Sequence, residues 1–463
     1  MAQISYIKYT DVLEARRYDA DFFMPVFLEM DKRIRSGISL INIAKTVDLQ
    51  SNGAFADIFA TLNDGNKKVI PYIRSSNVGD FFLNKTDLEF ISKEAHSKLK
   101  KTHTENQDVL MARKGKIGGA TIIFPEDMDL NTNDNVVNIK VIDERFNPFF
   151  VTTFLNSKYG LLQVNRFATG NVQPWLSMYQ VRILKIPLLP ELFQLQIEQI
   201  VKSAHQKQTQ SKKLYKEAEE ILLRELGLLD YEVKHSLWFT TTKKEIDNAK
   251  RYDSEYFQPK YDAIIKKIEK YEGGWDLVKE SVNFKDKNYN PKLDRKYKYL
   301  ALSNISSQGY VQDFQEEFGK DLPTRARRKI NTGDLIISSI EGSLSSCALI
   351  EQEFDNSICS TGFFVINSDK INSETLLILF KSDIIQELLQ RGSKGTILTA
   401  ISKTELESIK IPLINEEIQK EIAEKIQVSH KLRKESKELL EKAKKAVEIA
   451  IEENEATAME YLK

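Results

Sequence analysis

Several residue types that mark common protein classes are scarce in this chain of 463 residues. It has two cysteines, Cys347 and Cys359, which form no CxxC pair and have no histidine beside them. That spacing fits neither a disulfide framework nor a zinc site, so we predict two buried free thiols. The five histidines show no metal-ligand spacing, and the sequence predicts no bound metal.

Long apolar runs are absent as well, since none approaches the roughly 20 residues that span a bilayer. The first ten residues, MAQISYIKYT, have neither the basic region nor the apolar stretch of a secretion signal. We therefore predict a cytoplasmic protein with no membrane association. The 67 basic and 67 acidic residues cancel, but a nucleic-acid-binding protein needs only positive charge gathered on one face.

Complete catalytic motifs are also missing. NPFF at 147–150 is similar to the Asn-Pro-Pro-aromatic motif of DNA amino-methyltransferases, but Phe149 replaces the second proline and no FxGxG cofactor loop occurs. GSKGT at 392–396 lacks the spacing of a phosphate-binding loop. We therefore predict that the chain is not an enzyme and binds no cofactor itself.

An internal duplication is present instead. ARRYDADFFMPVF at 15–27 returns as AKRYDSEYFQPKY at 249–261, with six identical positions. A second match aligns 155–201 with 380–426 without a gap, and both copies contain KIPL. A repeat of this length predicts two homologous halves.

Each half begins with short runs rich in β-branched and aromatic residues, such as DVLMA at 108–112 and DLIISSI at 334–340. Runs of this kind, bounded by Gly, Asn and Asp, predict strands. Helical patterns follow at 149–167 and 373–390, and then come a Gly-marked loop and KIPL. The first part of each half is therefore predicted to be an α+β globule.

Two stretches after KIPL, 191–226 and 416–453, have the apolar spacing of a heptad seam. About 40 helical residues form a rod of about 60 Å. Neither rod has a globular core of its own, so we predict that the two pair with each other; the alternative is that each packs on its own globule. An antiparallel pair would hold the globules apart with approximate two-fold symmetry and would act as a ruler.

Positive charge recurs in the two halves near the start of a strand. The residues are Lys98, Lys100, Lys101, Arg113, Lys114 and Lys116 in the first half and Arg325, Arg327, Arg328 and Lys329 in the second. Positive charge at equivalent sites is what a surface that positions DNA phosphates requires. The alternative is a solvated face with no ligand.

The Gly-led loops 169–177 and 394–402 align but differ in content. We predict that they contact DNA through Asn171, Gln173 and Trp175 in the first loop and Lys394 and Thr396 in the second. The alternative, which the sequence favours equally, is that both loops are simply turns that cap the helices beginning after Ser177 and Ser402. Residues 28–95 and 262–320 scarcely align. A shared framework with divergent surfaces favours two modules that bind two different ligands in the same way.

The order of these features resembles the DNA specificity subunit of type I restriction-modification systems. The features are the RYDADFFMPVF segment, a strand that begins like NQDVLMAR or TGDLIISS, a Gly loop followed by Ser, and Ile-Pro-Leu before a long helix; all occur twice and together span nearly the whole chain. The resemblance implies that each half reads one part of a bipartite double-stranded DNA target. It also implies two methyltransferase subunits that use S-adenosylmethionine, and restriction subunits that use ATP and Mg²⁺.

The predicted fold class is therefore α+β, with two homologous target recognition domains joined by two helices in an antiparallel coiled coil with pseudo-two-fold symmetry. The predicted divisions are target recognition domains at 1–188 and 229–413, a central spacer helix at 189–228 and a C-terminal spacer helix at 414–463. The competing functions are a coiled-coil adaptor that binds protein without DNA specificity and, less favoured, a DNA methyltransferase or nuclease.

Overall fold

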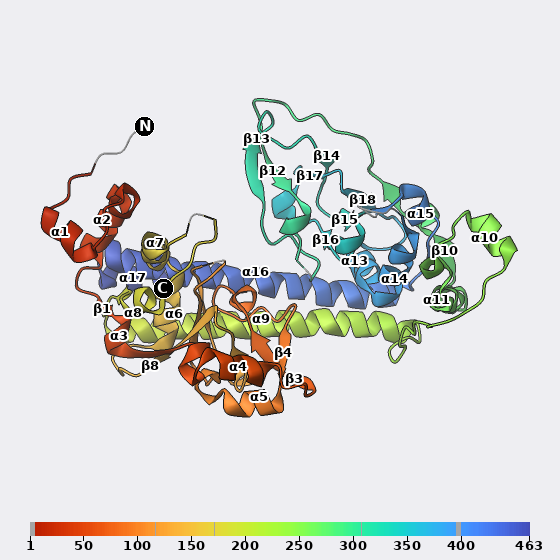
Figure 1. The fold of residues 1–463 in the computed structure, drawn as a ribbon. Helices are drawn as coiled ribbons and strands as arrows, with labels where there is room; N and C mark the ends of the chain where they lie inside the picture. Colours follow the sequence, from red (N-terminus) through yellow and green to blue (C-terminus); the bar gives the residue numbers. More distant parts are fainter. Residues whose placement is uncertain (1–4, 116, 171, 307, 395–399) are drawn as a thin grey trace. The chain divides into compact units, whose positions relative to one another are not determined.

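The computed structural model describes residues 5–115, 117–170, 172–306, 308–394 and 400–463 (Figure 1). The chain divides into two compact units: unit 1 comprises residues 1–209 and 433–463, and unit 2 comprises residues 210–432. Each unit contains β-sheets and helices, so the α+β prediction is confirmed.

The main sheet of each unit has four antiparallel strands in the same order. In unit 1 the order is β2 (Ala44–Val47), β8 (Val136–Val141), β5 (Val109–Ala112) and β6 (Ala120–Ile122). In unit 2 the order is β11 (Asn283–Phe284), β18 (Phe363–Asn367), β15 (Leu335–Ser338) and β16 (Cys347–Leu349). Most residues of β5, β6, β15 and β16 are fully buried, which explains their continuous apolar runs.

A smaller sheet is also shared. In unit 1, β3 (Lys68–Ile73) lies between antiparallel β4 (Glu89–Ser92) and parallel β7 (Asn131–Thr132). In unit 2, β12 (Lys296–Leu300) lies between antiparallel β13 (Gln315–Phe318) and parallel β17 (Ile358–Ser360), and β14 (Ala326–Lys329) extends the sheet beyond β17. Residues 28–95 and 262–320 thus carry equivalent strands although their sequences scarcely align.

Short strand pairs complete the sheet structure, and the KIPL segments contribute to two of them. The pairs are β1 (Ile38–Ser39) with β9 (Lys185–Ile186), β10 (Trp275–Leu277) with β21 (Lys410–Pro412), and β19 (Ser393–Lys394) with β20 (Ala400–Ile401).

Two helices follow the main sheet in each unit: α6 (Pro148–Asn156) and α7 (Lys158–Phe167) in unit 1, and α13 (Ser373–Lys381) and α14 (Asp383–Gly392) in unit 2. Gly160 lies so close to α6 that an added Cβ would collide with the Phe154 carbonyl oxygen.

The shorter helices of unit 1 are α1 (Tyr9–Ala15), α2 (Pro25–Arg33), α3 (Leu40–Ile43), α4 (Phe55–Leu62), α5 (Lys93–Lys98), α8 (Met178–Arg182) and α17 (Glu455–Leu462). Those of unit 2 are α10 (Lys243–Ala249), α11 (Pro259–Glu269), α12 (Val278–Ser281) and α15 (Lys403–Glu407).

The first copy of the repeated motif clamps the N-terminal segment onto unit 1. The Arg17 guanidinium donates to both carboxylate oxygens of Asp19, at 2.6 and 2.7 Å. Two guanidinium groups lie over the Phe22 ring in cation–π contacts, with Arg17 Cζ 4.9 Å and Arg166 Cζ 4.3 Å from the ring centroid. Arg166 on α7 also donates from Nε to the Phe22 carbonyl oxygen at 3.0 Å.

The second copy makes the same clamp in unit 2. Arg251 donates to Asp253 at 2.8 and 2.6 Å, and the Tyr256 ring has Arg251 Cζ at 4.5 Å and Arg391 Cζ at 4.6 Å. Arg391 on α14 donates from Nε to the Tyr256 carbonyl oxygen at 3.1 Å. The two arginine–aromatic stacks explain why the motif and a distant arginine recur together.

The two predicted rods are the helices α9 (Glu191–Glu225) and α16 (Glu416–Glu452), which lie side by side (Figure 1). Within unit 1, Ser436 Oγ donates to the Ala204 carbonyl oxygen at 2.7 Å. Within unit 2, Ser211 and Ser429 each donate from Oγ to the other's carbonyl oxygen at 2.8 Å. Residue numbers rise along one helix as they fall along the other, so the pairing is antiparallel, as predicted.

Both helices also complete the cores of the units. In unit 1, Phe193, Ile197 and Val201 of α9 and Ala446 and Val447 of α16 belong to the same buried cluster. In unit 2 the buried cluster takes in Ala218 and Leu222 of α9 and Ile422 and Ile426 of α16. The rods therefore pair with each other and pack on the globular parts as well, so both of the packings considered from the sequence contribute.

Candidate nucleic-acid interface

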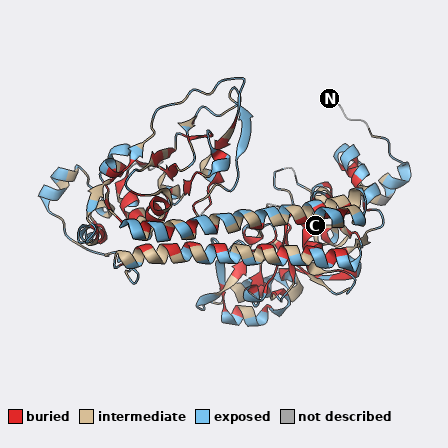
Figure 2. Ribbon diagram, turned by 180° about the vertical axis from the view of Figure 1, so that it is seen from behind, coloured by how far each residue is buried: buried red, intermediate tan, exposed pale blue. Residues whose placement is uncertain are grey.

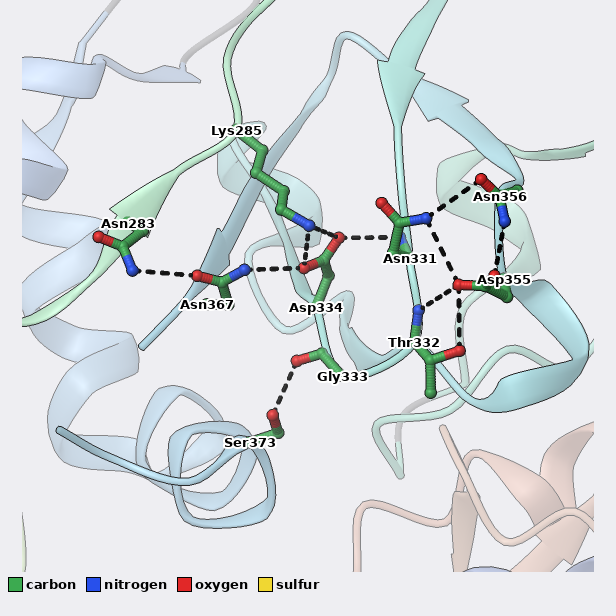
Figure 3. Close-up of polar contacts among 10 residues, drawn as sticks. All are labelled: Asn283, Lys285, Asn331, Thr332, Gly333, Asp334, Asp355, Asn356, Asn367 and Ser373. Atoms are coloured by element: carbon green, nitrogen blue, oxygen red, sulfur yellow. Dashed lines mark hydrogen bonds and ion pairs between the residues drawn. The ribbon is translucent and has the colours of Figure 1, made fainter. Parts of the chain in front are cut away.

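The aspartate at the start of strands β5 and β15 holds a turn in each unit. Asp334 is almost fully buried; its carboxylate accepts from Lys285 Nζ at 2.7 and 2.8 Å and from the Asn331 N–H at 2.8 Å (Figure 3). In unit 1, Asp108 accepts from the Glu105 N–H at 2.8 Å and from Asn138 Nδ2 at 2.7 Å. Burial raises the pKa of the Asp108 carboxyl above its ordinary value.

Loss of the Asp334 carboxylate should loosen the main sheet of unit 2. Asp334→Ala leaves Lys285 and the Asn331 N–H without this partner, which should cost about 2–3 kcal/mol of local stability. Hydrogen–deuterium exchange of the amides in β15 should then speed up by roughly 30- to 150-fold. The matched control is Asp355→Ala, which removes an exposed carboxylate from the same network; equal exchange in the two variants would contradict a special role for Asp334.

Main-chain bonds fix the Gly loop of unit 1 to the end of β5. Thr169 and Trp175 exchange backbone hydrogen bonds at 3.0 and 2.9 Å, and the Leu176 N–H donates to the Arg113 carbonyl oxygen at 2.8 Å. Gly170 has φ +98°, and an added Cβ would meet the Gln173 carbonyl oxygen at 2.6 Å, so glycine is required there. Gln173 and Trp175 are left exposed on this fixed loop. Lys116 and Asn171 lie outside the described residues.

Arg113 is buried, which differs from the phosphate contact predicted for it. Its guanidinium donates to the Asp134 carbonyl oxygen at 2.8 Å and to Asp48 Oδ2 at 3.3 Å. These bonds favour a structural role, because a buried charge with protein partners is not presented to a phosphate. Lys114 beside it is half-exposed, with Nζ 3.5 Å from Asp134 Oδ2. Its backbone forms a bridge to Trp175, so the structure brings these two candidates together.

In unit 2 the same backbone contacts tie the Gly loop to the segment after β15, but different residues make them. We call this shared set of backbone contacts the frame. Ile340 forms the bridge to Ala400, and the Ile401 N–H donates to the Ser339 carbonyl oxygen at 2.8 Å. Ile340 and Ala400 therefore take the places of Lys114 and Trp175. The backbone of Lys394 pairs with Ala400 in β19 and β20, whereas its side chain and Thr396 lie outside the described residues. The Ser177 and Ser402 side chains also cap the following helices, so the two interpretations of the loops are compatible.

The two basic clusters lie on different secondary structure. Lys98, Lys100 and Lys101 are exposed at the end of α5 and in the turn after it. In unit 2 the cluster occupies β14 and the residue before it, where Arg325 and Lys329 are exposed.

The other two arginines of the unit 2 cluster are half-buried and hold a neighbouring segment. Arg327 donates from Nη1 to Asn290 Oδ1 at 2.7 Å, and Arg328 donates to the Asp286 carbonyl oxygen. We therefore assign both to anchoring residues 286–290, with Arg325 and Lys329 left facing solvent.

That neighbouring segment is itself basic, which sequence comparison of the halves did not detect. Residues 285–298 contain six Lys or Arg and two Asp, with three tyrosines within or next to them. The Tyr289 N–H donates to the Arg327 carbonyl oxygen at 2.8 Å, which joins the segment to β14. We define the basic surface of unit 2 as the exposed residues Lys287, Lys292, Arg295, Lys296, Arg325 and Lys329. Positive charge with interleaved aromatics was the signal that could have found it.

Both cysteines are buried free thiols, as predicted. Burial raises the pKa of the Cys347 thiol to about 12 and also raises that of Cys359.

Among the described residues, no cluster of three or more His, Cys, Asp or Glu could hold a metal ion. No helix in the described part of the chain is both long and apolar enough to cross a membrane.

Comparison with known proteins finds a family match in the second half. Residues 283–444, from β11 into α16, match the family model of the type I restriction modification DNA specificity domain. The match covers this stretch alone, and it confirms the predicted resemblance of the chain to specificity subunits of these systems.

Similar solved structures include three from type I systems. The S subunit from M. genitalium has 12% identity and a TM-score of 0.41, over 92% of this chain and 95% of that one. The HsdS subunit from Thermoanaerobacter tengcongensis has 12% identity and a TM-score of 0.29, over 90% and 96%. A structure concerning complex assembly and conformational transition of the type I R-M system has 14% identity and a TM-score of 0.28, over 92% and 97%.

Proposed function

We propose that the chain is the specificity subunit of a type I restriction-modification complex and binds a bipartite double-stranded DNA target. The observation that carries this proposal is the match of residues 283–444 to the type I DNA specificity domain family, together with a second unit of the same strand order. The two units place different side chains on the same frame, as Lys114 and Trp175 compared with Ile340 and Ala400 illustrate. Two such frames suit two different half-sites.

In this proposal the chemistry belongs to partner subunits in the cytoplasm. Two methyltransferase subunits would use S-adenosylmethionine, and restriction subunits would use ATP and Mg²⁺ for cleavage. The chain itself would select the DNA and would not catalyse a reaction.

The purified chain should therefore be inactive alone. Incubated with S-adenosylmethionine and duplex DNA, it should transfer no methyl groups, whereas addition of the partner methyltransferase subunits should give methylation at one bipartite sequence. Radiolabel incorporation followed by mapping of the modified sites measures both results. Methyl transfer by the chain alone would make it an enzyme, and no affinity for duplex DNA even with partners would favour the adaptor function.

A further inference from the structure

Two phenylalanine side chains of unit 1 stand exposed on the short helix α4. Phe55 and Phe59 are 70% and 59% exposed. Residues four apart lie on the same side of a helix, and the two rings stack with centroids 6.2 Å apart and planes at 24°. We call these two residues the phenylalanine pair. Large apolar side chains gathered in water are typical of a binding surface.

Packing on the smaller sheet holds α4 in place below the pair. Ile58, between the two phenylalanines, belongs to the same buried cluster as Tyr72 of β3 and Ile91 of β4. Figure 2 shows buried residues inside this part of unit 1 and exposed residues on the helices and loops around it. The phenylalanine pair is therefore presented on a helix that the core fixes from its other side.

Exposed lysines lie next to the start of α4. Asn52, three residues before Phe55, accepts from the Lys101 N–H at 2.9 Å and donates from Nδ2 to Thr102 Oγ1 at 3.1 Å. These bonds tie the chain before α4 to a turn in which Lys100 and Lys101 are exposed. Positive charge beside exposed aromatic rings is typical of a surface that binds nucleic acid.

The acidic residue of α4 does not interrupt this surface. Asp57 is two positions from each phenylalanine, and residues two apart do not face the same side of a helix.

The phenylalanine pair occupies the same place in the chain order of unit 1 as the basic segment does in unit 2. Helix α4 lies in the connection from β2 of the main sheet to β3 of the smaller sheet. The same connection in unit 2, from β11 to β12, is residues 285–295, which include Lys287, Lys292 and Arg295 of the basic surface. One connection thus presents aromatic rings in unit 1 and positive charge in unit 2. Duplex DNA suits both, because it offers stacked bases to the rings and phosphates to the charges.

We propose that the phenylalanine pair enters the DNA at one base step of the half-site bound by unit 1 and partly unstacks it. The side chains of Lys98, Lys100 and Lys101 hold the phosphates beside that step. Pyrimidine–purine steps unstack at the least cost, so the pair selects such a step without a hydrogen bond to a base. This inference rests on the proposed function, in which duplex DNA is the ligand.

The test uses a fluorescent base as a probe of stacking. The duplex carries the bipartite sequence found by methylation mapping, with 2-aminopurine in place of one adenine at a time, and is bound by the chain with its methyltransferase subunits. Every TA or CA/TG step contains an adenine, so each flexible step is sampled. 2-Aminopurine emission rises when the base leaves the stack. Extrusion of the base that the methyltransferase modifies is common to all variants and is subtracted.

The unaltered chain should raise the emission at one step of the unit 1 half-site, and the double variant Phe55→Ala/Phe59→Ala should abolish that rise. The affinity of the double variant should fall roughly tenfold to a hundredfold. The slope of log K against log salt should stay unchanged, because no charge is removed. The double variant Phe55→Leu/Phe59→Leu keeps an apolar wedge and should restore most of the emission.

The matched control is Phe90→Ala. Phe90 is 44% exposed on β4, and its neighbour Ile91 packs with α4, so Phe90 points to the opposite face of the smaller sheet. This variant should keep both the emission and the affinity of the unaltered chain. Equal thermal midpoints for all variants show that the exposed rings do not hold the fold together.

The outcomes separate this inference from the proposed function. Sequence-specific binding with unchanged emission and affinity in the alanine double variant would overturn the inference while the proposed function stands. A fall in affinity with no emission change at any step in the unaltered chain would also overturn it, since the pair would then contact DNA without entering it. If the unaltered chain gives no sequence-specific binding with its partners, the proposed function itself fails.

Discussion

Alanine replacement of Lys292, Arg295, Lys296 and Arg325 should weaken binding of the chain to duplex DNA by roughly a hundred- to a thousand-fold at about 0.1 M salt. All four side chains are exposed on the basic surface of unit 2, where two chain segments are joined by the Tyr289–Arg327 bond. Each lost phosphate contact should lower the slope of log K against log salt by about 0.9, so the slope should fall by up to about 3.6. Arg327 and Arg328 are left in place because they hold the segment.

The salt titration has a matched control with equal loss of charge. Replacing four lysines with exposed side chains outside this surface should leave the slope nearly unchanged; they are Lys32, Lys213, Lys216 and Lys279. Equal slopes for the unaltered chain and the basic-surface variant would show that this surface is solvated and contacts no phosphate.

Paired insertions of seven residues, after residue 214 in α9 and after residue 427 in α16, should lengthen the DNA spacer without changing either half-site. The two points lie opposite each other, between the Ser211–Ser429 bonds and the Lys425–Glu217 ion pair at 2.7 Å. Seven residues restore the heptad seam and add about 10 Å to the pair, with a rotation of about 20°. That length corresponds to about three base pairs.

Methylation of a DNA library with randomised spacers, in the presence of the methyltransferase subunits, measures the effect. We expect a preferred spacer two to four base pairs longer, about one per 3.4 Å. Three-residue insertions at the same points break the seam and should abolish activity, because the apolar faces no longer meet. Full activity on the original spacer after the seven-residue insertions would show that the helices do not measure DNA.

Much of the fold could be predicted because its elements depend on local pattern. The strands at DVLMA and DLIISSI and the bounds of α9 and α16 follow from runs of apolar residues and from a heptad seam, which need no knowledge of distant contacts. The repeated motif could be found by comparison of the halves, but its purpose depends on Arg166 and Arg391, more than 130 residues away in each case.

The candidate interface was less predictable for the same reason. Charge in the sequence does not say which side chains face solvent, so Arg113, Arg327 and Arg328 were grouped with exposed residues although protein groups hold them. The basic segment 285–298 cannot be found by comparison of the halves, because it aligns with nothing in the first half. Its place beside β14 depends on strand pairing between residues about 40 positions apart.

We propose above all that this chain supplies DNA sequence specificity to partner methyltransferase subunits. Methylation mapping by single-molecule sequencing tests it most directly, with genomic DNA treated by those subunits alone, with the chain, and with the chain altered at Lys292, Arg295, Lys296 and Arg325. We predict one bipartite methylated sequence with the chain, none without it, and strongly reduced methylation of that sequence with the variant. The same methylated sites with and without the chain would contradict the claim.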